Sequence, residues 1–147
     1  MATVTKVIDA PRERVWAVLA NGWSYASWVV GAAHIRAVDA GWPAPGASIH
    51  HSVAPWPLTI EDVTVVRAAR PGESLELDAK AWPLGAARVR LELDSIDSSN
   101  TKIQMSEWIE HGAGRFLPSK LQVALLVARN RESLDRLGDL SRGDGPM

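Results

Sequence analysis

The sequence predicts an α+β fold with a curved seven-stranded antiparallel sheet, two short helices after the first strand and one long C-terminal helix. Three observations predict it. Hydrophobic residues alternate with a period of two through most of residues 34–111, the gaps between these runs are short, and apolar residues then recur at helical spacing. Parallel crossovers need a dozen or more residues, so short gaps favour antiparallel hairpins. The apolar face of such a sheet would wrap around the long helix.

The first 30 residues predict one strand and two short helices. The β-branched segment Thr3–Ile8 has the composition of a strand. Pro11 suits the first position of a helix that ends at Asn21-Gly22, and a second short helix is expected over Ser24–Val29. Turn residues then separate six further predicted strands, which are His34–Asp39, Ala47–Val53, Leu58–Arg67, Ser74–Ala81, Ala86–Ser95 and Thr101–His111.

The last predicted element is a helix of about 20 residues that follows Pro118 and ends at Gly138. Its apolar residues form two sets, at positions 121, 124, 125 and 128 and at positions 123, 127, 134 and 137, which we expect to be adjacent buried stripes. Its basic residues, including Arg129, should face solvent, with Glu132 as a minor partner of Arg129. Residues 1–140 then form a single domain, and residues 141–147 form a polar tail.

The composition restricts the class of protein. The chain has 147 residues, of which 46% are hydrophobic and 22% are charged, as in a globular domain. Its net charge of −1 provides no basic excess for a phosphate backbone, so nucleic acid is not an expected partner. The absence of cysteine excludes disulfides and thiol nucleophiles. The spacing of the four histidines, at positions 34, 50, 51 and 111, does not predict a metal site, and no cofactor is expected.

Targeting signals are not evident in the sequence. The N-terminus lacks a basic region followed by an apolar run, so we expect a cytoplasmic protein. Two long stretches without charged residues, Val15–Ile35 and Gly41–Ile60, are interrupted by glycine, proline and polar residues. A membrane span is therefore not predicted. The oligomeric state is left open between monomer and homodimer.

The order of these elements, the run VIDAPRERVW at residues 7–16 and the position of Trp28 resemble the START-like helix-grip superfamily over about residues 3–140. Within it, the chain is most similar to bacterial polyketide cyclase/dehydrase-like (SRPBCC) proteins. The resemblance implies a helix-grip fold with a cavity between the sheet and the long helix. Members of the superfamily bind lipids or hormones, cyclise aromatic polyketides or act as co-chaperone-like domains, and a fold alone does not choose among these activities.

Strand alternation predicts what lines this interior. The apolar residues of two neighbouring strands become smaller toward Ala81 and Ala87, which leaves room at that end. A well-packed core without a cavity is the alternative.

Three polar groups fall on these inner faces. Glu107 has the parity of Ile103 and Met105, and His51 has the parity of Ile49. One residue of the pair Glu61-Asp62 must also face inward, and the sequence does not decide which. His51, Glu107 and Asp62 could serve as acid and base catalysts, anchor a ligand or form only structural hydrogen bonds.

Aromatic residues cluster in the predicted turns. Trp28, Trp56, Trp82 and Phe116 are expected at one end of the sheet, where they could form a rim around the cavity mouth; alternatively, each packs against its own turn. Trp16 and Trp23 are instead expected to pack the first helices on the sheet.

The function predicted from these features is the binding of a hydrophobic or amphipathic small molecule, such as a lipid, a polyketide or an aromatic metabolite. One alternative is a cyclase or dehydratase that uses His51 and Glu107 as acid and base. The other is a protein-interaction domain whose interior is filled by side chains. The predicted ligand-binding residues are Trp28, His51, Trp56, Leu77, Ala79, Trp82, Val89, Leu91, Met105, Glu107, Phe116, Leu121 and Leu125.

Overall fold

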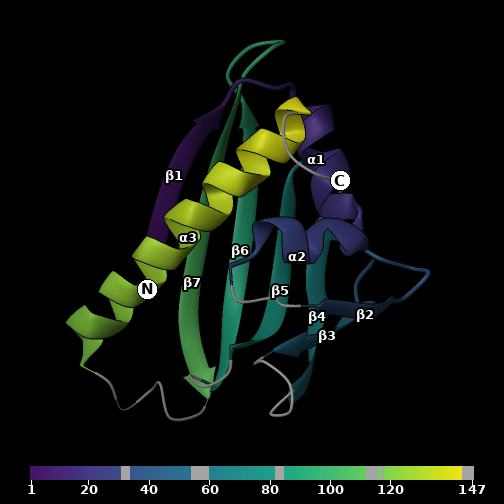
Figure 1. The fold of residues 1–147 in the computed structure, drawn as a ribbon. Coiled ribbons are helices and arrows are strands. Elements are labelled where there is room, and N and C mark those ends of the chain that lie inside the picture. The colour runs from purple at the N-terminus through teal and green to yellow at the C-terminus, as the bar shows by residue number, and fades with distance from the viewer. Residues whose placement is uncertain (31–33, 54–59, 82–84, 112–115, 117, 144–147) are drawn as a thin grey trace.

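A computed structural model describes residues 1–30, 34–53, 60–81, 85–111, 116 and 118–143 of the chain. Its seven strands form one antiparallel sheet in the order β1-β7-β6-β5-β4-β3-β2, with helices on one face (Figure 1). The strands are β1 Ala2–Ile8, β2 His34–Val38, β3 Ser48–Val53, β4 Ile60–Arg70, β5 Ser74–Ala81, β6 Gly85–Ser95 and β7 Thr101–His111. The helical elements are α1 Arg12–Ala20, the 3₁₀ turn η1 Gly22–Ser24, α2 Tyr25–Trp28 and α3 Ser119–Arg142. The predicted helix-grip α+β fold is confirmed.

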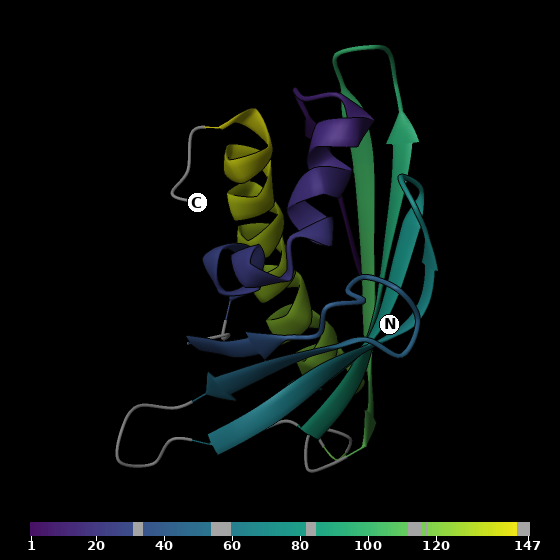
Figure 2. The same ribbon diagram turned by 90° about the vertical axis from the view of Figure 1, so that its right-hand side faces the viewer.

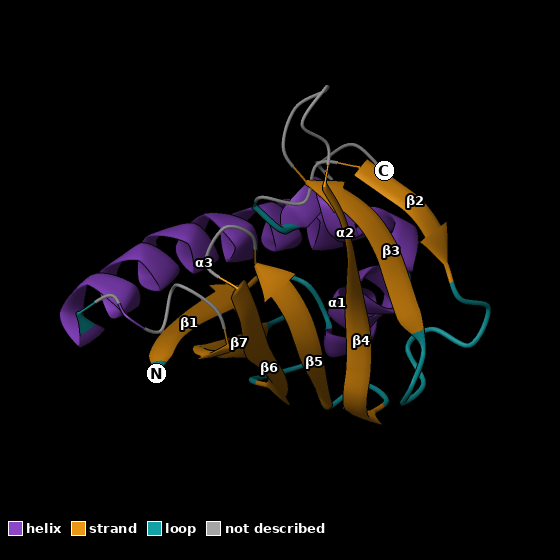
Figure 3. Ribbon diagram, turned by 90° about the horizontal axis from the view of Figure 1, so that it is seen from below, coloured by secondary structure: helices purple, strands orange, loops and turns teal. Residues whose placement is uncertain are grey.

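The sheet is strongly curved around the helices. Strands β2, β3 and β4 bend toward the side on which α1, α2 and α3 lie (Figure 2), and from below the sheet forms a shell around the helical layer (Figure 3). The strand pairing shifts register within β2, within β4 and at the end of β7 that faces Ala86. Such irregularities bend a strand and increase its twist. The curvature creates the interior in which the buried polar residues lie.

The core lies between the concave sheet face and α3. Leu77, Leu91 and Ile103 of the sheet are fully buried, as are Leu134 and Leu137 of the helix. The alternation predicted for β5, β6 and β7 therefore holds: the odd-numbered residues face the helix, and the charged residues between them form a ladder on the outer face. In that ladder the Arg88 guanidinium lies 3.1 Å from the Asp78 carboxylate of the neighbouring strand.

The predicted end of the long helix is wrong. The helix continues through Gly138 to Arg142 and ends at Gly143, whose φ of 81° is a left-handed conformation that favours glycine. Gly138 is buried because the helix lies close to β1 there: a Cβ at this position would be 3.3 Å from Lys6 Cε and 3.7 Å from Ile8 Cγ1. The glycine permits close packing rather than ending the helix, and Ser141 is a buried helical residue, not part of a tail.

One of the two predicted helix stripes is also wrong. Positions 134 and 137 are buried and positions 123 and 127 are half-buried, but all of positions 121, 124, 125 and 128 are exposed. At about 100° per residue, Leu125 lies roughly 180° around the helix from Leu134. The first turns of α3 also extend beyond the edge strand β1 (Figures 1 and 3). The sheet therefore covers only one of the two sets.

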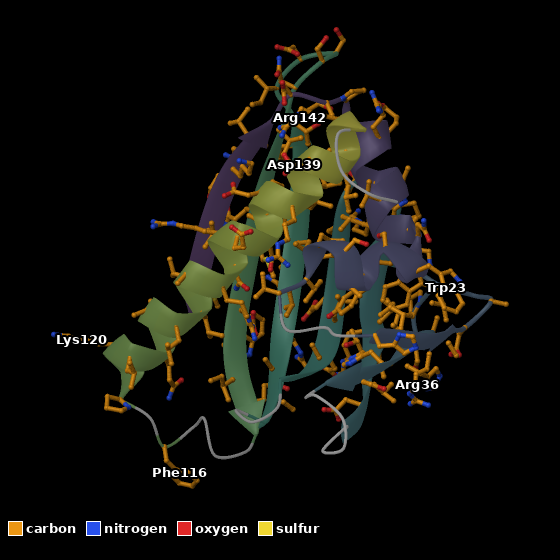
Figure 4. All side chains as sticks on the ribbon, in the orientation of Figure 1. Trp23, Arg36, Phe116, Lys120, Asp139 and Arg142 are labelled. Carbon is orange, nitrogen blue, oxygen red and sulfur yellow. The ribbon has the colours of Figure 1, made fainter. Side chains whose placement is uncertain are left out.

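Trp23 likewise differs from its prediction. It belongs to η1 and is 58% exposed, pointing away from the core (Figure 4). The short 3₁₀ turn buries its neighbours Gly22 and Ser24 instead, and Ser24 Oγ donates a hydrogen bond to the Val18 carbonyl at 2.8 Å. Trp16 is half-buried and packs against the core, as expected.

No helix among the described residues is both long enough and apolar enough to cross a membrane.

Candidate interior binding site

The first group of polar residues in the interior centres on Glu107 of β7. Glu107 lies opposite Ala2 of β1 and Val89 of β6, and it is 1% exposed. Its Oε1 accepts a hydrogen bond from Asn130 Nδ2 at 3.0 Å, and its Oε2 is paired with the Arg129 guanidinium. Both partners come from α3, so these contacts join the long helix to β7, the strand beside the edge strand β1.

The expectation that Arg129 faces solvent beside Glu132 is wrong. Arg129 turns toward Glu107, while Glu132 pairs with Arg136 at 3.0 Å. The buried carboxylate requires a cation or donors, because an isolated buried charge is expensive. One signal in the sequence could have indicated this arrangement: Asn130 lies four residues before Leu134, on the side of the helix that the core-facing leucines define.

The second group of polar residues links β3, β4 and α2. His51 is 2% exposed, and its Nε2 lies 2.9 Å from Thr64 Oγ1. The same Thr64 hydroxyl lies 3.4 Å from the Tyr25 hydroxyl. The Tyr25 ring stacks on the His51 ring, with 6.0 Å between the two ring centroids. Tyr25 and Thr64, neither of which was predicted as a site residue, therefore orient His51 in the interior.

The charges around these two groups link them in space. Burial raises the pKa of Tyr25, the hydrogen bond from Thr64 opposes this shift, the Glu107 charge raises the pKa further and the Arg129 charge lowers it. Burial also lowers the pKa of His51; Asp62 opposes this shift, and Arg36 and His50 add to it. Tyr25, a member of the second group, is thus near enough to the first group for the charges of Glu107 and Arg129 to act on its hydroxyl.

Asp62, rather than Glu61, belongs to this inner face. In the β3–β4 pair, Asp62 lies directly opposite His51, and Thr64 lies opposite Ile49. Antiparallel residues that are directly opposite share a face of the sheet. Asp62 is half-buried, so its carboxylate is less enclosed than the His51 ring.

The structure places the predicted apolar lining in two environments. Leu77, Ala79, Val89, Leu91 and Met105 are buried on the inner face of the sheet. The side chains of Leu121 and Leu125 are exposed on the opposite side of α3 and do not line the interior. Their expected position in the lining is therefore wrong, and their role in ligand binding stays a prediction.

The predicted aromatic rim is not supported by its two described members. Trp28 is buried and packs edge-on against Tyr25, with 5.7 Å between the ring centroids. Phe116 is 88% exposed and points outward (Figure 4). Trp28 is a core residue rather than part of a rim, because it packs within the main hydrophobic core. Trp56 and Trp82 lie outside the described residues.

A small cavity of about 220 Å³ adjoins the Glu107 side of the site. It lies between β1, the end of β7 and the first turns of α3, where Ala2, Ile109 and Leu126 contribute to its wall together with Glu107. Glu107 therefore lies at the wall of this cavity, with both of its carboxylate oxygens paired to α3. Among the described residues, no group of three histidines or carboxylates could hold a metal ion.

Two buried polar atoms of the site have no hydrogen-bond partner among the described residues: His51 Nδ1 and Asn130 Oδ1. Most buried polar atoms in proteins are paired, so each exception requires an explanation. One atom belongs to each of the two polar groups. Each of the two polar groups therefore has a buried atom with free hydrogen-bonding capacity.

The buried state of His51 predicts a pH dependence of stability. The pKa of His51 is lower in the folded protein than in the unfolded chain, so the unfolded chain binds more protons between the two values. We expect the free energy of unfolding to be highest above about pH 6.5 and to fall as the pH decreases through the folded pKa. Urea titrations of the wild type and His51→Gln between pH 5 and 8 measure this, and the fall should be smaller in the variant.

The control for this measurement is His34→Gln, which replaces an exposed histidine of β2. Its pH profile should match that of the wild type. Identical profiles for all three proteins would contradict the assignment of this dependence to His51.

A sequence model of the family described as polyketide cyclase / dehydrase and lipid transport matches residues 1–142, nearly the whole chain. The protein belongs to this family, as the sequence resemblance indicated. No curated protein matches the chain.

Solved structures share the fold at low sequence identity. A START superfamily protein from Mycobacterium smegmatis is 13% identical with a TM-score of 0.73, over 97% of each chain. The ZhuI aromatase/cyclase from Streptomyces sp. R1128 is 15% identical with a TM-score of 0.67, over 96% of this chain and 92% of that one. Protein NE0264 from Nitrosomonas europaea is 15% identical with a TM-score of 0.71, over 97% and 94% of the two chains.

Proposed function

We propose that the protein binds a hydrophobic or amphipathic small molecule between the concave sheet face and α3. The observation that carries this proposal is the pair of buried polar atoms, His51 Nδ1 and Asn130 Oδ1, that lack partners among the described residues. A ligand with polar groups at matching positions would satisfy both atoms. The buried apolar residues around them, among them Leu91 and Met105, would contact its apolar part.

The family to which the chain belongs supports the same proposal, because its description includes lipid transport. A small cavity between β1, the end of β7 and the first turns of α3 adjoins Glu107 at the edge of this interior. A domain whose interior is filled by its own side chains remains the competing explanation, with a protein as its partner.

Native mass spectrometry of the purified protein, before and after solvent extraction, tests the proposal. We expect a stoichiometric extra mass that extraction removes and that returns when the extracted protein is incubated with a ligand. Suitable candidates are fatty acids, hydroxylated aromatics and aromatic polyketides. A clean apo mass that resists all three classes would contradict ligand binding.

A cyclase or dehydratase activity is the second candidate, and the hydrogen bonds from Tyr25 through Thr64 to His51 favour it. Burial lowers the pKa of His51, so its neutral form is available to accept a proton near neutral pH. The geometry favours His51 over Glu107 for this role, because both carboxylate oxygens of Glu107 already accept hydrogen bonds.

Incubation with a linear poly-β-ketone tests this candidate. Cyclised product should form faster with the wild type than without protein, and His51→Gln should lose this acceleration while it still binds the substrate. Equal product with and without the protein would exclude the activity for that substrate.

A further inference from the structure

The orientation of the Asn130 amide is determined by Glu107. A carboxylate paired with a guanidinium presents only acceptor oxygens, so the Asn130 amide must present its NH2 group to Glu107 Oε1, which it does at 3.0 Å. The amide oxygen is then directed away from Glu107. This oxygen is buried and has no partner among the described residues. It is an acceptor that requires a donor.

His51 Nδ1, the other buried atom without a partner among the described residues, does not require a donor in the same way. His51 Nε2 shares a hydrogen bond with Thr64 Oγ1, and the Thr64 hydroxyl can either donate or accept. His51 Nδ1 is therefore an acceptor in one tautomer and a donor in the other. It can bind either kind of polar group, so the requirement for a donor comes from Asn130.

We propose that the interior site selects an uncharged ligand with a hydroxyl or N–H donor, and that this group donates a hydrogen bond to Asn130 Oδ1. The proposal rests on the proposed ligand-binding function and specifies its ligand class as hydroxylated apolar molecules, such as phenols. An aromatic ether or ketone lacks the donor, so it would leave the buried amide oxygen unpaired.

The same arrangement disfavours carboxylates. An anionic head group placed against Asn130 Oδ1 would meet the negative end of the amide dipole, with the Glu107 carboxylate bonded directly behind it. The guanidinium of Arg129 is already paired with Glu107. The site therefore discriminates against fatty acids, which the apolar lining alone would accept.

Four naphthalene derivatives of similar shape test the selectivity: 2-naphthol, 2-methoxynaphthalene, 2-acetylnaphthalene and 2-naphthoate. Their dissociation constants can be measured on the extracted full chain by isothermal titration calorimetry. We expect 2-naphthol to bind about tenfold more tightly than the methoxy and acetyl compounds, which corresponds to about one buried hydrogen bond. The carboxylate 2-naphthoate should bind most weakly of the four.

Glu107→Gln should remove this preference. The glutamine must direct its oxygen toward Arg129, so its NH2 group faces Asn130, whose amide then turns over to accept the hydrogen bond. The atom left free becomes the donor Asn130 Nδ2. The variant should bind 2-acetylnaphthalene at least as tightly as 2-naphthol. Glu132→Gln makes the same chemical change at an exposed position of α3 and should retain the wild-type order.

The outcomes separate this inference from the proposed function. Binding of the naphthalenes with equal affinity, or tightest binding of 2-naphthoate, would overturn the selectivity but leave ligand binding intact. An unchanged order in folded Glu107→Gln would overturn the role of Asn130. Should that variant not fold, Asn130→Leu replaces it and should abolish the advantage of 2-naphthol. If none of the four compounds binds at millimolar concentration and no ligand co-purifies, both proposals fail.

Discussion

Arg129→Met is expected to lower the free energy of unfolding by about 3–5 kcal/mol, the range found when one partner of a buried ion pair is removed. Glu107 is 1% exposed, and its carboxylate would lose the only guanidinium bonded to it among the described residues. Methionine keeps most of the length and the apolar contacts of the arginine side chain, so the loss measures mainly the uncompensated charge. Urea denaturation at pH 7 followed by circular dichroism gives the value.

Two controls identify the cause of this loss. Arg131→Met changes an exposed arginine of the same helix and should alter stability by no more than about 0.5 kcal/mol. The double variant Arg129→Met/Glu107→Gln removes the buried charge together with its partner and should recover most of the lost stability. Equal effects of Arg129→Met and Arg131→Met would show that the pair contributes little.

Leu134→Ala is expected to lower the free energy of unfolding by about 2–5 kcal/mol, because it removes three buried carbon atoms and leaves a cavity. Leu134 is fully buried in the core between α3 and the sheet. The surrounding strands are held by antiparallel pairing to their neighbours, so they have little freedom to close around the smaller side chain. The same urea titrations measure the loss.

The matched control is Leu125→Ala in the same helix. Leu125 is 46% exposed, and alanine has the higher helix propensity, so its stability should remain within about 0.5 kcal/mol of the wild type. This comparison also tests the rotation of α3. A large loss from Leu125→Ala and a small one from Leu134→Ala would mean that the helix presents its other face to the sheet.

Most strands and their pairing could be predicted from the sequence, because period-two alternation and short gaps depend only on neighbouring residues. The alternation of Leu75, Leu77 and Ala79 with charged residues determines which side of β5 faces the core. Helix α3 was harder, since both of its apolar sets have helical spacing and the sequence does not record how far the sheet extends beneath them. The helix end predicted at Gly138 is wrong for a related reason: in sequence, a glycine that permits close packing cannot be distinguished from one that ends a helix.

The candidate site likewise contains residues that the sequence predicts and partners that it does not. Parity along single strands placed Glu107 and His51 on the inner face, and both are buried there. Their partners Arg129, Asn130 and Tyr25 come from helices distant in sequence, and no local pattern connects them. The pair Glu61-Asp62 was ambiguous until the register of β3 against β4 placed Asp62 opposite His51.

By itself, the sequence determined the order of strands and helices, the inner faces of the strands and the presence of polar groups among apolar residues. These properties follow from local periodicity and turn chemistry. Only the tertiary structure decided which face of α3 is buried, that Arg129 neutralises Glu107, and that Asn130 Oδ1 and His51 Nδ1 have no partner in the part of the chain that the structure describes. The physical reason is that charge pairing and hydrogen-bond satisfaction depend on distances between segments far apart in the chain, which the curvature of the sheet and the rotation of the helix determine.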